Sequence, residues 1–109
     1  MPNLSRPVKA TMFPVDGKNY FFKSFDLDDQ PTDILTEAKT ELGDVIHVSI
    51  EMMTDDVIAN LSVNGVPATT SNGKSVQMSS SWDRRMVFNS LYANCGSGGR
   101  IEVEYWNGE

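Results

Sequence analysis

The chain has 109 residues, of which 39 % are hydrophobic and 22 % charged, so it holds enough apolar material for one core and too much for a disordered protein. Its net charge of −6 repels phosphate backbones, which argues against a nucleic-acid partner. No apolar run approaches the roughly 20 residues of a membrane helix, and the first ten residues lack the apolar core of a signal peptide. We therefore expect a protein that is made in the cytoplasm, is not secreted and has no membrane partner.

The N-terminus differs in composition from the rest of the chain. Two prolines among the first seven residues disfavour both helix and central strand, so we predict an extended arm over residues 1–7 and one domain over residues 8–109. Arg6 and Lys9 are the only charged residues among the first ten. We expect them to contact a protein partner; the alternative is a frayed terminus.

The next segments alternate apolar and polar residues, which is typical of strands. Residues 8–12 and 20–25 are predicted strands, separated by a turn at residues 16–19. The loop at residues 26–31 contains three aspartates, which suit calcium, but it lacks the glycine and the glutamate of the twelve-residue calcium-binding loop. A plain acidic loop is the interpretation that we favour there.

Residues 32–42 form the single predicted helix. Four apolar residues recur on one face of it: Ile34, Leu35, Ala38 and Leu42. Thr32 or Asp33 is predicted to cap its start, and Gly43 to end it.

The clearest strand pattern lies within residues 43–65. Apolar and polar residues alternate over residues 46–52 and again over residues 57–63. The sequence Thr-Asp-Asp at residues 54–56 can turn the chain, so the two segments are predicted to pair as a β-hairpin.

Three more strands are predicted, at residues 75–82, 86–92 and 100–106, with a glycine-rich loop at residues 94–99 before the last one. In the last strand Glu102, Glu104 and Trp106 point away from the core. Seven strands separated by short turns predict an all-β fold, an antiparallel β-sandwich with jelly-roll-like strand order. An immunoglobulin-like order is the alternative.

The residues that carry chemistry do not form a recognisable catalytic or metal-binding motif. His47 is the only histidine and Cys95 the only cysteine, so the Cys/His ligands of a zinc site are missing. A Cys95–His47 dyad can be written down, but nothing in the sequence brings the two together. We expect a protein that is not an enzyme and needs no cofactor or metal.

The most distinctive polar segment is Trp82-Asp83-Arg84-Arg85. Tryptophan and arginine are over-represented at the energetic centres of protein interfaces. Trp82, Arg84, Arg85 and the outward-pointing Trp106 are therefore candidate partner-binding residues. The alternative is that Trp82 belongs to the core and the arginines are solvated.

In size and in its strand-rich body from Val8 to Trp106, the chain resembles the small decoration, or cement, proteins of tailed-bacteriophage capsids. The resemblance is general and rests on no residue motif. It implies a structural protein of the virion that binds the major capsid protein, oligomerises on the assembly and stabilises the shell.

A carbohydrate-binding module is the alternative function, because jelly-roll sandwiches also serve as lectins. Exposed aromatic and amide side chains would bind the sugar, and five residues are candidates: Trp82, Trp106, Tyr92, Asn89 and Asn107.

Overall fold

The computed structural model describes residues 19–65 and 76–108, so the predicted arm, the predicted first strand and the turn at residues 72–73 lie outside the described residues. The described residues form eight strands and one short helix: β2 (Tyr20–Leu27), β3 (Thr32–Asp33), α1 (Thr36–Leu42), β4 (His47–Met52), β5 (Ala59–Val63), β6 (Val76–Met78), β7 (Ser81–Arg85), β8 (Leu91–Asn94) and β9 (Gly99–Trp106). None of the described residues forms a helix long and apolar enough to cross a membrane.

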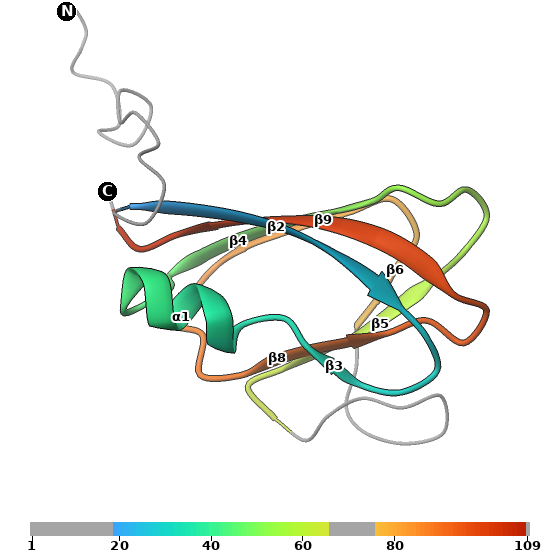
Figure 1. The fold of residues 1–109 in the computed structure, drawn as a ribbon, viewed down its shortest axis with the longest axis horizontal. Helices are drawn as coiled ribbons and strands as arrows, with labels where there is room; N and C mark the ends of the chain where they lie inside the picture. Colours follow the sequence, from blue (N-terminus) through green and yellow to red (C-terminus); the bar gives the residue numbers. More distant parts are fainter. Residues whose placement is uncertain (1–18, 66–75, 109) are drawn as a thin grey trace, which may run out of the picture.

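The strands build two antiparallel sheets that face each other, with the orders β2-β9-β4-β7 and β3-β8-β5-β6 (Figure 1). Only the connection from β5 to β6 stays within one sheet; the other connections between successive strands cross from one sheet to the other. This arrangement is an eight-stranded jelly roll, which confirms the predicted all-β sandwich and its jelly-roll-like order. The immunoglobulin-like alternative does not fit this order.

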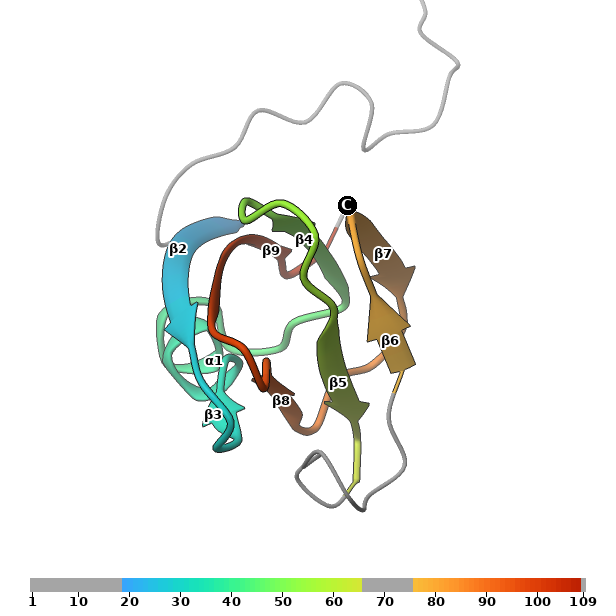
Figure 2. The same ribbon diagram turned by 90° about the vertical axis from the view of Figure 1, so that its right-hand side faces the viewer.

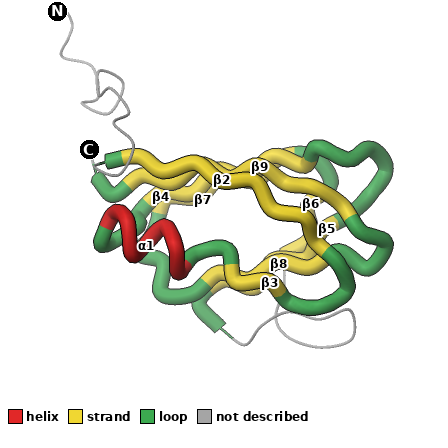
Figure 3. The backbone as a smooth tube through the Cα atoms, viewed as in Figure 1, coloured by secondary structure: helices red, strands yellow, loops and turns green. Residues whose placement is uncertain are grey.

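The core lies between the two sheets and consists of the side chains that alternate inward from each strand. Ile101, Val103 and Tyr105 of β9 are buried, as predicted, and they face Leu61 of β5 and Leu91 of β8 in the buried cluster. Helix α1 fills the opening between the edge strands β2 and β3 at one end of the sandwich (Figures 2 and 3). The sandwich is therefore closed at the end where β2 begins.

The predicted hairpin within residues 43–65 is wrong. β4 pairs with β7 and β9, whereas β5 pairs with β6 and β8 in the opposite sheet. The connection between them crosses the sandwich, and Asp56 there has a φ of 62°. Alternation predicts the two strands correctly, but it is the same for strands in one sheet and for strands in facing sheets.

Two other strand boundaries differ from the prediction. Residues 75–82 do not form one strand, because the chain leaves β6 after Met78 and enters the other sheet as β7 at Ser81. In residues 86–92 only the last two residues are in a strand, and the buried Phe88 lies in the loop before β8. Phe88 anchors this loop in the core. In the sequence, such a buried loop residue cannot be distinguished from an inward-pointing strand residue, because both are apolar.

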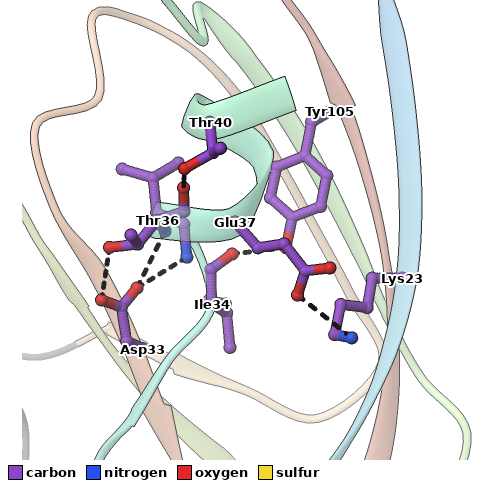
Figure 4. Close-up of polar contacts among 8 residues, drawn as sticks. Lys23, Asp33, Ile34, Thr36, Glu37, Thr40 and Tyr105 are labelled. Atoms are coloured by element: carbon purple, nitrogen blue, oxygen red, sulfur yellow. Dashed lines mark hydrogen bonds and ion pairs between the residues drawn. The ribbon is translucent and has the colours of Figure 1, made fainter. Parts of the chain in front are cut away.

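The predicted helix begins too early, since residues 32 and 33 form the short strand β3. The Asp33 carboxylate nevertheless accepts hydrogen bonds from the backbone N–H groups of Leu35 and Thr36, at 2.9 and 3.0 Å, and from the Thr36 hydroxyl (Figure 4). Gly43 ends the helix as predicted, with a φ of 85° and its N–H bonded to the carbonyl of Lys39.

Candidate functional site

One face of the β2-β9-β4-β7 sheet points away from the core, and among the described residues no strand or helix packs on it. Its side chains form three rows across the sheet. We call this surface the outer face, and its residues, row by row, are Tyr20, Trp106, His47 and Arg85; Phe22, Glu104, Ser49 and Asp83; Ser24, Glu102, Glu51 and Ser81. Residues directly opposite each other in such rows have Cβ atoms about 5 Å apart, so their side chains interact.

The first row is a line of rings that stand against one another. The ring of His47 stacks on Trp106, with centroids 4.6 Å apart and an interplanar angle of 27°. Tyr20 meets Trp106 from the other side in an edge contact, with centroids 5.6 Å apart. Trp106 therefore lies between two neighbouring rings, and the three side chains form a continuous row across the sheet.

The second and third rows hold three glutamates around a hollow. Phe22, Ser49, Glu51, Glu102 and Glu104 line this hollow, whose volume is about 140 Å³. Phe22 is 44 % exposed, although it lies in the middle of a strand. Glu104 accepts a hydrogen bond of 2.8 Å from the Tyr20 hydroxyl, which links the hollow to the ring row.

The outer face is acidic. Four carboxylates, those of Glu51, Asp83, Glu102 and Glu104, stand against one guanidinium, that of Arg85, so its net charge is −3 with His47 neutral. His47 Nε2 lies 2.9 Å from an Asp83 carboxylate oxygen, and this contact fixes the imidazole beside Trp106.

The structure divides the predicted partner-binding residues between two sides of the sheet. Trp106 and Arg85 lie on the outer face, on either side of His47. Trp82 points inward, is only 8 % exposed and packs edge-on against Phe88. Strand alternation puts exposed Arg84 on the same side as Trp82, with its guanidinium 5.9 Å from the centroid of that ring. Arg6 and Lys9 lie outside the described residues.

The candidate sugar-binding residues are not gathered in one place. Trp82 is in the core, and Tyr92 is on β8 of the opposite sheet. Asn89 lies in the loop before β8, where its backbone N–H donates to the Asn64 side chain. Only Trp106 and Asn107 are neighbours, and the Asn107 side chain donates to the carbonyl of Leu42.

The residues considered for catalysis or metal binding also remain apart. Cys95 is buried near Gly99 at the start of β9, whereas His47 pairs with Trp106 at its end, about 20 Å away along the strand. The predicted acidic loop at residues 26–31 begins too early, because Asp26 is still in β2, where it pairs with Arg100. In the loop after β2, Asp28 accepts a hydrogen bond from the N–H of Gln30. Within residues 19–65 and 76–108, no group of three or more His, Cys, Asp or Glu side chains could hold a metal ion.

The sequence prediction did not select Phe22, Glu51, Glu102 or Glu104 as binding residues. Alternation in the last strand does place Glu102, Glu104 and Trp106 on one outward face. The missing information was the identity of the neighbouring strands, since only the pairing of β9 with β2 and β4 brings Phe22 and Glu51 beside the two glutamates.

No family model matches this chain, and no match was found among curated proteins or solved structures.

Proposed function

We propose that the chain is a structural, non-enzymatic protein that binds another protein through the outer face. One observation carries this proposal: Phe22, on the edge strand β2 of an open sheet face, is 44 % exposed, beside a row of rings and a cluster of carboxylates. Exposed aromatic side chains are enriched at protein interfaces. The carboxylates beside Phe22 would select a partner of opposite charge.

The geometry supports binding better than catalysis. The hollow of the outer face has a volume of about 140 Å³ and is lined by one aromatic and four polar side chains. A small-molecule site usually has about 300–1,000 Å³ and a mostly apolar lining with a few convergent polar groups. The rigid sheet places the side chains of its three rows in fixed register, which suits recognition of a surface. The most useful test is therefore a binding assay with variants of single exposed side chains.

The setting that we propose is the shell of a tailed-bacteriophage capsid, with the major capsid protein as the partner. It is supported by the small size and the sandwich body of the chain, and it depends on the general resemblance described above. Because one fold serves many functions, the jelly roll alone does not choose this setting.

Co-sedimentation of the purified chain with assembled shells of the phage that carries its gene tests the setting. We expect saturable binding of the unaltered chain and weaker binding of Phe22→Ser. Val87→Ser is the matched control, because Val87 is 65 % exposed but lies outside the outer face. The proposal of a capsid role would be abandoned if the unaltered chain stayed in the supernatant.

Sugar binding is the second candidate function. Exposed Phe22 beside three glutamates offers a ring for stacking and acceptors for sugar hydroxyls. The indole of Trp106, however, already stacks on His47 and makes an edge contact with Tyr20, so a pyranose ring would compete with these neighbours. A glycan screen in which Phe22→Ser abolishes binding would favour this candidate.

A further inference from the structure

We propose that the hollow beside Phe22 binds a basic side chain, a lysine or an arginine, of the partner protein. This inference rests on the proposed binding function and names the chemistry of the partner surface. It concerns the part of the outer face where Phe22 and the three glutamates meet.

The charge of the hollow is unbalanced. Glu51 and Glu102 are directly opposite each other on β4 and β9, and Glu104 is the next outward residue along β9. Like charges in this position destabilise a sheet. Among the described residues no lysine, arginine or histidine forms an ion pair with any of the three glutamates. A cation bound from outside the chain would reduce the repulsion among the three carboxylates, so its binding would be electrostatically favourable.

One wall of the hollow is aromatic. Phe22 lies directly opposite Glu104, so a ring and a carboxylate border the same space. A lysine or arginine has an apolar stem that can pack on the ring and a charged head that can reach the carboxylates. A cation near the face of an aromatic ring gains further electrostatic attraction. The combination suits a basic side chain better than a small metal ion, which would not use the ring.

Charge also indicates which molecule carries the cation. The whole chain has a net charge of −6, so the acidic outer faces of two copies repel each other. A nucleic acid would be repelled for the same reason. A basic surface of a different protein is therefore the occupant that charge complementarity selects.

The test uses the full-length chain and two synthetic peptides, acetyl-Val-Lys-Val-Lys-Val-amide and its counterpart with glutamine in place of lysine. Binding is followed by nuclear magnetic resonance of the backbone amides and of the Trp106 indole. We expect the lysine peptide to shift the signals of Phe22, Glu102 and Glu104 in a saturable way. The glutamine peptide should not, and 0.5 M NaCl should weaken the binding because it screens exposed charges.

Two double variants separate the hollow from the general acidity of the chain. Glu51→Gln with Glu102→Gln should weaken binding of the lysine peptide by about 2- to 30-fold, the range expected for the loss of two exposed ion pairs. Asp44→Asn with Asp55→Asn removes the same charge from exposed residues outside the outer face, and it should leave the affinity nearly unchanged.

Equal affinities of the two double variants for the lysine peptide would overturn the proposal, and so would shifts confined to residues outside the outer face. A neutral oligosaccharide that shifts the Phe22 signal more strongly than the lysine peptide would assign the hollow to a sugar. If the lysine peptide does not bind while Phe22→Ser still weakens shell binding, the inferred chemistry is wrong and the proposed binding function stands.

Discussion

Tyr105 connects the core of one sheet to the segment that begins the helix. Its hydroxyl donates a hydrogen bond to the carbonyl of Ile34, one of the two fully buried residues between β3 and α1 (Figure 4). Burial raises the pKa of Tyr105 far above its ordinary value, and the nearby carboxylates of Glu37 and Asp33 raise it further. The hydroxyl therefore remains a neutral donor over the whole range in which the protein is handled.

Replacing Tyr105 by phenylalanine should lower the free energy of unfolding by about 1–3 kcal/mol, because the buried Ile34 carbonyl loses its partner. Urea unfolding followed by fluorescence measures the change. Tyr92→Phe is the matched control, since no hydrogen bond of this half-buried hydroxyl is found within the described part of the chain. A loss of similar size in the control would show that removing a hydroxyl, and not this particular bond, is responsible.

Asp33 makes the stability depend on pH. Burial by itself would raise the pKa of Asp33, but hydrogen bonds from the Thr36 side chain and from the backbone N–H groups of Leu35 and Thr36 outweigh it and lower the pKa. A carboxyl whose pKa is lower in the folded chain stabilises the fold above its unfolded-state pKa, which is about 3.9. That contribution is lost as the pH falls through the folded-state pKa.

We therefore expect Asp33→Asn to lower the free energy of unfolding by at most about 1 kcal/mol at pH 7, because water screens this exposed carboxylate, and by less as the pH falls through the folded-state pKa. Urea unfolding of Asp33→Asn and of the unaltered chain at several pH values measures the difference in their free energies of unfolding. The titration of the other carboxyls cancels in this difference. Asp55→Asn, at an exposed residue whose side chain has no hydrogen bond within residues 19–65 and 76–108, should show no such dependence. A difference in the free energy of unfolding between Asp33→Asn and the unaltered chain that is the same at every pH would contradict this explanation.

At the scale of elements, Asn64 fastens the end of β5 to the loop that precedes β8. Its side-chain oxygen accepts from the N–H groups of Asn89 and Ser90, at 2.6 and 3.2 Å, and its side-chain nitrogen donates to the carbonyl of Val87 at 2.9 Å. The backbone of Asn64 has a φ of 52°, a region that asparagine tolerates better than most residues. One side chain thus satisfies three backbone groups of a loop that carries the buried Phe88.

Asn64→Gly should lower the free energy of unfolding by about 1–3 kcal/mol, because glycine keeps the positive φ but leaves the three loop groups without this partner. Asp56→Gly is the control at the other non-glycine residue with positive φ, where no side-chain hydrogen bond is found within the described residues. Thermal unfolding compares the two. Equal losses would mean that backbone freedom, and not the hydrogen bonds of Asn64, sets the effect.

The strands could be predicted from the sequence where their apolar period is unbroken, and the inward residues of β9 and β4 follow from it directly. Strand neighbours could not be predicted, because alternation carries no information about pairing. The segment between Met52 and Ala59 shows this, since a turn-forming Thr-Asp-Asp serves a crossing between sheets as well as a hairpin. Phe88 shows a related difficulty, because an apolar residue that is buried from a loop fits the alternating pattern of a strand.

The candidate site was also predictable only in the part that depends on a single strand. The outward direction of Trp106, Glu102 and Glu104 could be predicted from one strand alone. The hollow could not, because it needs Phe22 from β2 and Glu51 from β4, which are 29 residues apart in the sequence and meet only through β9. The four-residue segment Trp82-Asp83-Arg84-Arg85 seemed a single patch, yet a strand must send its successive side chains to opposite faces.

At the scale of the whole molecule, electrostatic repulsion opposes the compact state. The net charge is −6, and eleven of the fifteen acids fall within residues 16–56. One of these, Glu51, lies on the outer face in close register with Glu102 and Glu104. Such repulsion is weakened by salt, because the screening length falls from about 30 Å at 0.01 M to about 10 Å at 0.1 M ionic strength. Raising the salt concentration should therefore stabilise this chain.

We expect the melting temperature to rise by a few degrees between 10 and 300 mM NaCl, which corresponds to about 0.5–1 kcal/mol for a domain of this size. Glu51→Gln with Glu102→Gln should melt higher than the unaltered chain at 10 mM NaCl and respond less to salt, because it removes the pair of like charges that face each other. Differential scanning calorimetry of this variant and of Asp44→Asn with Asp55→Asn measures both effects. A melting temperature that falls with salt would mean that attractive ion pairs outweigh the repulsion. Equal salt responses of the two double variants would mean that the repulsion is spread over the molecule and is not concentrated on the outer face.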